Sequence, residues 1–249
     1  MTLKEIREEA WDVAGDVSDI DRDRLWTETE MNRYINRTLR KICSDTLCLR
    51  DAETPEICLI DSAPVDYTTY VEGTLDYIWA NDPDNWLYQQ NVAPYLFDLD
   101  ERILQIDEIK WSNRSWKLRK VSCQKWQKNP WWERVIGLPT EYATDLTNGK
   151  IALNFRDTGT DTLALVVKRM PLEDLVEDSD VPEIRTQYHD RILNGVLEKM
   201  YRKQDAETFN KVKAEEYREL FLDDIDFIKQ EEEELNIKLN SNPSLSAFL

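Results

Sequence analysis

Two consecutive amphipathic helices between Pro182 and Ile228 constrain the fold of this chain more than any other stretch. In the first helix, apolar side chains recur every four residues, at Ile184, Tyr188, Ile192, Val196 and Met200. This spacing places them on one stripe of a helix and does not fit a strand. Pro182 suits the first turn of that helix, because its φ is fixed and the N–H that it lacks has no partner there.

The second helix follows after a short polar break. The break, Lys203-Gln204-Asp205, offers Asp205 as an N-cap, and the next apolar stripe passes through Phe209, Val212, Tyr217, Phe221, Ile225 and Ile228. Because the join is short, the pair forms a helical hairpin or a kinked helix. Leu193 and Leu197 on the first helix are expected in the buried seam against the N-terminal helices.

Two shorter helices are predicted at the N-terminus. Thr2 and Glu5 form a capping-box pattern, followed by a short apolar face that ends near Gly15. Thr27 and Glu30 repeat the pattern before a longer helix that extends toward Leu49.

From about Thr54 the apolar period changes to two, which is typical of strands. The predicted strands are Ile57–Ile60, Val65–Val71, Ile103–Trp111 and Trp116–Trp126. Gly149–Phe155 and Thr162–Lys168 flank a turn sequence and predict a β-hairpin.

The predicted fold class is therefore α+β, with a helical core and an inserted antiparallel β lobe. The predicted parts are N-terminal helices of the core (1–52), the β-rich lobe (53–172), the long C-terminal helices of the core (173–239) and an extended tail (240–249).

The charge pattern limits the possible partners. A formal net charge of −18 argues against non-specific wrapping of DNA, which needs a surplus of Lys and Arg on the binding face. Asp51–Glu101 has twelve acidic and no basic residues, whereas Arg102–Arg134 has nine basic and three acidic ones. Two interpretations stay open: solvated faces of unlike charge, or complementary surfaces that pair between subunits through Lys117, Arg119 and Lys120.

Metal, cofactor and membrane binding find little support in the sequence. The four cysteines form no C-x-x-C pair, His189 is the single histidine, and the six glycines are scattered singly. No apolar run approaches the roughly 18 residues of a membrane span. We expect a soluble protein with no cofactor and no metal site.

Seven of the nine tryptophans lie between residues 79 and 132, an unusual density. Trp111 and Trp116 occupy strand positions typical of a core. Trp131 and Trp132 are adjacent and point to opposite faces of a strand, so one of them is exposed. A protein interface is the favoured use of this pair. The alternative is a carbohydrate-binding or carbohydrate-active β lobe, because fifty acidic residues leave a catalytic carboxylate pair possible.

The order of parts resembles the head-to-tail adaptor (connector) proteins of tailed bacteriophages. Thr27–Asn36 is similar to the family's "ELxxYIN" helix. The resemblance continues in order through Arg102–Trp111, Leu138–Ala143, Gly149–Phe155, Val167–Leu172, Val181–Glu183 and Tyr188-His189. Thr74–Leu96 departs from the family pattern as an insertion.

This resemblance implies a structural virion protein that is not an enzyme. It would be one subunit of a dodecameric ring that sits below the portal and lines the DNA channel. Its implied partners are the portal protein, a nozzle or tail-completion protein of the tail, further copies of itself, and DNA that passes without sequence-specific binding. Its implied location is the head–tail junction of the virion, and the host cytoplasm during assembly. A C-terminal extension in such adaptors reaches the portal, so Leu245, Phe248 and Leu249 are expected to dock on the portal or a neighbouring subunit.

Overall fold

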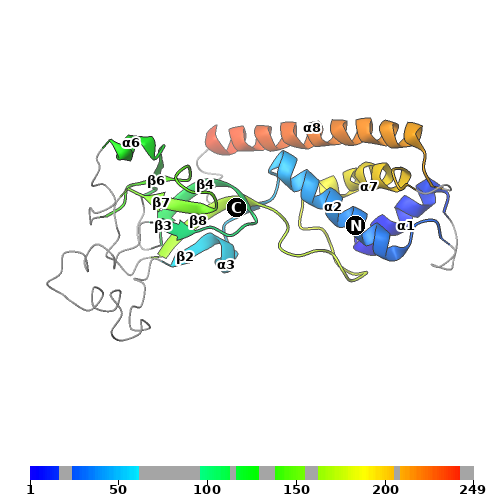
Figure 1. The fold of residues 1–249 in the computed structure, drawn as a ribbon, viewed down its shortest axis with the longest axis horizontal. Coiled ribbons are helices and arrows are strands. Elements are labelled where there is room, and N and C mark those ends of the chain that lie inside the picture. Colours follow the sequence, from blue (N-terminus) through cyan, green and yellow to red (C-terminus); the bar gives the residue numbers. More distant parts are fainter. Residues whose placement is uncertain are drawn as a thin grey trace. The chain divides into compact units, whose positions relative to one another are not determined.

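The computed structural model of the protein describes residues 1–16, 24–61, 96–112, 116–128, 138–154, 162–204 and 208–241. The chain forms two compact units: a helical unit (Met1–Leu49 with Arg169–Leu249) and a β unit (Arg50–Lys168). The helices of the helical unit come from both ends of the chain, and the described strands come from the part of the sequence between them, as the colours of Figure 1 show. The predicted α+β fold class is confirmed.

The N-terminal helices are α1 (Leu3–Ala14) and α2 (Glu28–Thr46). Both predicted capping boxes are present, with the Thr2 and Thr27 hydroxyls accepting from the N–H groups of Glu5 and Glu30. Gly15 ends α1 with φ 78°, a left-handed conformation that glycine adopts without steric cost. The second helix ends at Thr46, three residues before the predicted limit.

The C-terminal segment contains a 3₁₀ helix (η4, Thr186–Arg191), α7 (Ile192–Tyr201) and α8 (Lys211–Ser241). The predicted helical start at Pro182 is wrong. The carboxylate of Glu183 accepts a hydrogen bond from the Leu172 N–H at 2.6 Å and pairs with Arg169 at 2.7 Å. These contacts hold Glu183 against Arg169 and Leu172, so no helix begins at this point.

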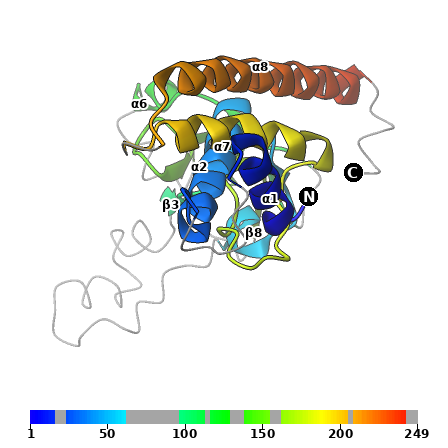
Figure 2. The same ribbon diagram turned by 90° about the vertical axis from the view of Figure 1, so that its right-hand side faces the viewer.

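Helix α7 lies at the centre of the helical unit, with α8 along one side and α1 and α2 on another (Figure 2). The shared core includes Met31, Ile35, Ile192, Val196, Leu197, Phe221, Ile225 and Ile228. Gly195 allows the closest approach: a Cβ there would lie 2.6 Å from Thr38 Cγ2 and 2.8 Å from the Phe221 ring. Leu197 is buried as predicted, and Leu193 is partly buried.

The second predicted stripe is correct only in part. Phe221, Ile225 and Ile228 are buried, but Phe209 and Val212 are exposed, Val212 to 79%. Val212 precedes Phe221 by nine residues, about two and a half helical turns, so the two side chains point to opposite sides of α8.

The β unit contains two four-stranded sheets. In the first, β8 (Thr162–Arg169) pairs with β1 (Arg50–Asp51), β2 (Leu59–Asp61) and β4 (Ile103–Trp111). In the second, the order is β3 (Leu96–Asp98), β7 (Lys150–Leu153), β6 (Glu141–Ala143) and β5 (Arg119–Lys120). The β5–β6 pair is parallel, so the second sheet is mixed.

The predicted hairpin between Gly149–Phe155 and Thr162–Lys168 is wrong, although both strands exist. β7 pairs with β3 on one edge and β6 on the other, and β8 belongs to the first sheet. Both edges of β7 are therefore occupied, which leaves no edge for β8.

Further expectations for the β unit need correction, and one of them concerns residues that the structure does not describe. Residues 55–58 form a short helix, α3 (Pro55–Cys58), and the strand begins only at Leu59. Within the expected strand Trp116–Trp126 only β5 is a strand, and α6 (Gln124–Gln127) begins before its end.

Trp111 is buried as predicted, but Trp116 is exposed. Val65–Val71 lies outside the described residues. All four cysteines are free and buried.

Candidate functional site

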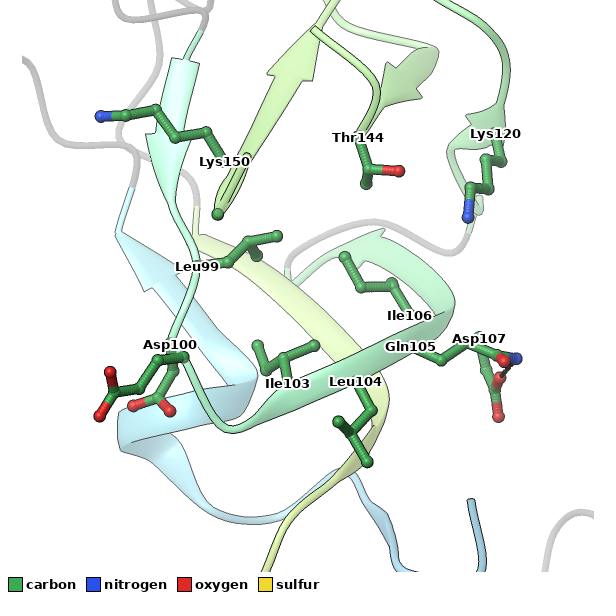
Figure 3. Close-up of a pocket in the computed structure, with 12 residues that line it drawn as sticks. Leu99, Asp100, Ile103, Leu104, Gln105, Ile106, Asp107, Lys120, Thr144 and Lys150 are labelled. Atoms are coloured by element: carbon green, nitrogen blue, oxygen red, sulfur yellow. Dashed lines mark hydrogen bonds between the residues drawn. The ribbon is translucent and has the colours of Figure 1, made fainter. Parts of the chain in front are cut away.

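A cavity of about 680 Å³ in the β unit is lined by both charged and apolar side chains. Leu99, Ile103 and Ile106 point toward its centre from β4 and the turn before it (Figure 3). Lys120, Thr144 and Lys150 come from the strands of the second sheet and the turns beside them. The cavity thus has an apolar floor and a charged rim.

Two of the three carboxylates that line the cavity, Asp100 and Asp107, are held by cations and amides of the same chain. Asp100 pairs with Arg102 at 2.8 Å, and this hydrogen bond lowers the pKa of Asp100 to about 2. Asp107 accepts from Gln105 Nε2 at 2.8 Å and lies 3.7 Å from Arg50 Nε. A glycosidase acid needs a raised pKa. Six described carboxyl groups have a pKa that differs from its usual value, and in all six the pKa is lowered, not raised: Glu30, Asp45, Asp100, Glu141, Asp145 and Asp180.

The described residues offer neither a cluster of metal ligands nor a membrane-spanning helix. Within the described ranges, no three His, Cys, Asp or Glu side chains gather closely enough to hold a metal ion. No helix in the described part of the chain combines the length and the apolar character needed to cross a membrane.

The three basic residues predicted for inter-subunit pairing lie close together in the β unit. Lys117 Nζ is 2.6 Å from Glu108, and Arg119 pairs with Glu141. Lys120 lines the cavity and forms no ion pair with a described residue. Lys120 is therefore the member of the trio whose charge is most available to another molecule.

Glu141 is the centre of a polar network in the β unit. It accepts from Arg119, from Lys125 Nζ at 2.6 Å and from Trp126 Nε1 at 3.1 Å. Burial raises the pKa of Glu141, but these three hydrogen bonds outweigh burial and lower the pKa to about 2. The network connects β5 and α6 to β6.

The other predicted contact residues lie outside the described residues. These are Trp131 and Trp132, expected at a tail-protein interface, and Leu245, Phe248 and Leu249, expected at the portal. Both assignments stay predictions.

Sequence reasoning missed two charged stripes in the helical unit. The exposed side of α2 carries Arg33, Arg37, Arg40 and Lys41, and the exposed side of α8 is acidic. The signal was present in the sequence, because basic residues at positions i, i+4, i+7 and i+8 share one helical face.

The comparisons with known proteins give a family. The sequence profile described as SU10 adaptor protein matches residues 1–241, which include all of the described residues. The chain belongs to this family of phage adaptor proteins. No curated protein matches the chain.

Proposed function

We propose that this protein is a head-to-tail adaptor subunit, which forms a ring below the portal and connects the capsid to the tail. The observation that carries the proposal is the family match, because it spans both the helical unit and the β unit. The role is structural, and the ring has twelve copies in the arrangement that the resemblance implies.

The charge of the C-terminal region supports a channel for DNA. Residues 171–239 contain twenty acidic and ten basic residues. Such a surface repels phosphate, so DNA can slide past it without being held. The protein would contact DNA only during passage, with no sequence-specific binding.

Portal attachment is assigned to the C-terminal tail. Helix α8 has 31 residues, and at ~1.5 Å per residue it is about 46 Å long. The C-terminal end of α8 at Ser241 is therefore far from the first turn of the helix. Leu245, Phe248 and Leu249 would then anchor in apolar pockets of the portal or of a neighbouring subunit.

The β unit would provide contacts with the tail protein and with neighbouring subunits. Trp131 and Trp132 are proposed for the tail protein, since exposed aromatic side chains are effective anchors at interfaces. Lys117, Arg119 and Lys120 are proposed for pairing with the acidic segment of the next subunit. Because Lys117 and Arg119 already have partners within the chain, Lys120→Glu tests this pairing with the least disturbance of the β unit.

Co-sedimentation with portal-bearing, tailless heads tests the proposal. The full chain is expected to pellet with heads, whereas a chain that ends at Leu239 stays in the supernatant. A matched variant with Leu245→Ser, Phe248→Ser and Leu249→Ser keeps the length of the tail and isolates its apolar anchors. Pelleting of the truncated chain at the level of the full chain would refute the docking role. Absence of the full chain from every head pellet would refute the adaptor role itself.

A further inference from the structure

The exposed face of α2 is a basic stripe on a strongly acidic protein. Arg33, Arg37, Arg40 and Lys41 all point away from the buried stripe of this helix. Arg40 pairs with Asp174, and Lys41 pairs with Asp45 at 2.7 Å. Arg33 and Arg37 form no ion pair with any residue that the structure describes. Two guanidinium groups therefore remain available to another molecule.

Helix α7 adds positive charge beside this stripe. Lys199 Nζ donates to Thr38 Oγ1 at 3.0 Å and to the Gly195 carbonyl oxygen at 3.1 Å. Burial lowers the pKa of Lys199, and the nearby charges of Lys41, Arg202 and Arg37 lower it further, against the opposing effect of Glu198. Lys199 therefore lies close to Lys41 and Arg37 of α2.

The exposed face of α8 has the opposite charge. Its exposed carboxylates are Glu215, Glu216, Glu219, Asp223, Asp226, Glu233 and Glu234. Glu215 pairs with Arg218 at 2.6 Å and Asp226 lies 3.7 Å from Lys229, while Glu219 and Asp223 form no ion pair with a described residue. We call this set the α8 acidic stripe. The exposed Val212 and Ile237 lie on the same side of the helix and add apolar surface to it.

Each stripe is only partly neutralised by ion pairs with described residues of the helical unit. The buried residues of α2 and of α8 pack in one core with α7, and the residues of the basic stripe and of the α8 acidic stripe are exposed. Each stripe is one-sided in charge and cannot pair with itself, which disfavours a two-fold contact between like surfaces. Pairing therefore requires a different surface on a second molecule.

We propose that the basic stripe of α2 on one copy docks on the α8 acidic stripe of the next copy. This inference rests on the proposed function, since a ring of identical subunits needs two different and complementary patches on each subunit. Copies with a formal charge of −18 repel one another, so a local basic face is what allows them to approach. The contact belongs to the helical unit and is separate from the pairing proposed for Lys120. It would cover the α8 acidic stripe, so the acidic channel surface proposed above would be formed by the other carboxylates of residues 171–239.

Two charge-reversed variants test the docking. One carries Arg33→Glu and Arg37→Glu, and the other carries Glu219→Lys and Asp223→Lys; all four side chains are exposed. Each variant alone places like charges in every contact, and we expect ring formation on portal-bearing heads to weaken by at least about 100-fold, since like charges across an interface are strongly unfavourable. A mixture of the two variants should form rings in which they alternate. A single chain with all four substitutions should also form rings.

The outcomes separate this proposal from others. Unchanged assembly of both single-face variants would overturn the docking, and so would failure of the mixture and of the four-substitution chain. If the α2 variant loses binding to duplex DNA while its assembly is unchanged, the basic stripe contacts nucleic acid and the proposal is wrong. Failure of the unsubstituted protein to bind heads contradicts the adaptor function instead. Thermal melts of each variant check folding, and Arg37→Gln with Asp223→Asn provides a milder pair, for which we expect a smaller loss of assembly.

Discussion

Replacing Glu141 by Gln removes the negative charge at the centre of the β-unit network. Glu141 is buried, and its partners are Arg119, Lys125 and the Trp126 indole. Its pKa lies near 2 in the folded protein, against about 4.3 in an unfolded chain. This difference of about 2 pKa units corresponds to about 3 kcal/mol of stability at neutral pH. We expect Glu141→Gln to lose about 2 to 3 kcal/mol at pH 7.

The pH dependence fixes the sign of this effect. A carboxyl group with a lowered pKa contributes its full stabilisation above the unfolded pKa and loses it as the pH falls through the folded pKa. The difference between the wild-type protein and Glu141→Gln should therefore be constant above about pH 5, shrink below pH 4 and nearly vanish by pH 2.

Urea unfolding at several pH values, followed by tryptophan fluorescence, measures this difference. Glu108→Gln is the matched control, because Glu108 pairs with the exposed Lys117 in the same unit. Exposed pairs contribute about 0 to 1 kcal/mol, so the control should change little. A loss at Glu141 that stays the same from pH 7 to pH 2, or one no larger than the control, would refute the charged network as the source of stability.

The remaining predictions concern packing and attachment. Gly195→Ala should destabilise the helical unit by about 1 to 3 kcal/mol despite the better helix propensity of Ala, because its Cβ would overlap Thr38 and the Phe221 ring; a melting temperature at or above that of the wild type would contradict this. Leu197→Ala should cost about 2 to 5 kcal/mol in a denaturant titration, since this side chain is buried in the core, and a negligible shift would place it outside. Truncation after Leu239 should leave the melting temperature unchanged, because the core cluster ends at Ile228, and an appreciable fall would assign the tail a folding role.

Local signals in the sequence predicted local structure well. The capping boxes at Thr2 and Thr27 are correct because each depends on side chains only three residues apart. The strand Ile103–Trp111 is correct to the residue, although the alternation of buried and exposed residues shifts by one position between Ile106 and Ile109. These features need no knowledge of the rest of the fold.

Strand pairing and the absence of a helix start at Pro182 could not be predicted, because they depend on distant residues. The partners of β7 are β3 and β6, which precede it in the chain and occupy both of its edges, so adjacency to β8 was misleading. Glu183 holds Leu172 and Arg169, a tertiary contact that no helical pattern reveals. The charged stripes of α2 and α8 could have been found, since fixed helical spacing alone defines them.

The most direct test of the adaptor assignment is cryo-electron microscopy of portal-bearing, tailless heads incubated with the purified protein. We expect a closed ring of density directly below the portal, in which the α2 face of each subunit lies against the α8 face of the next. A bare portal vertex in the presence of excess folded protein would contradict the assignment.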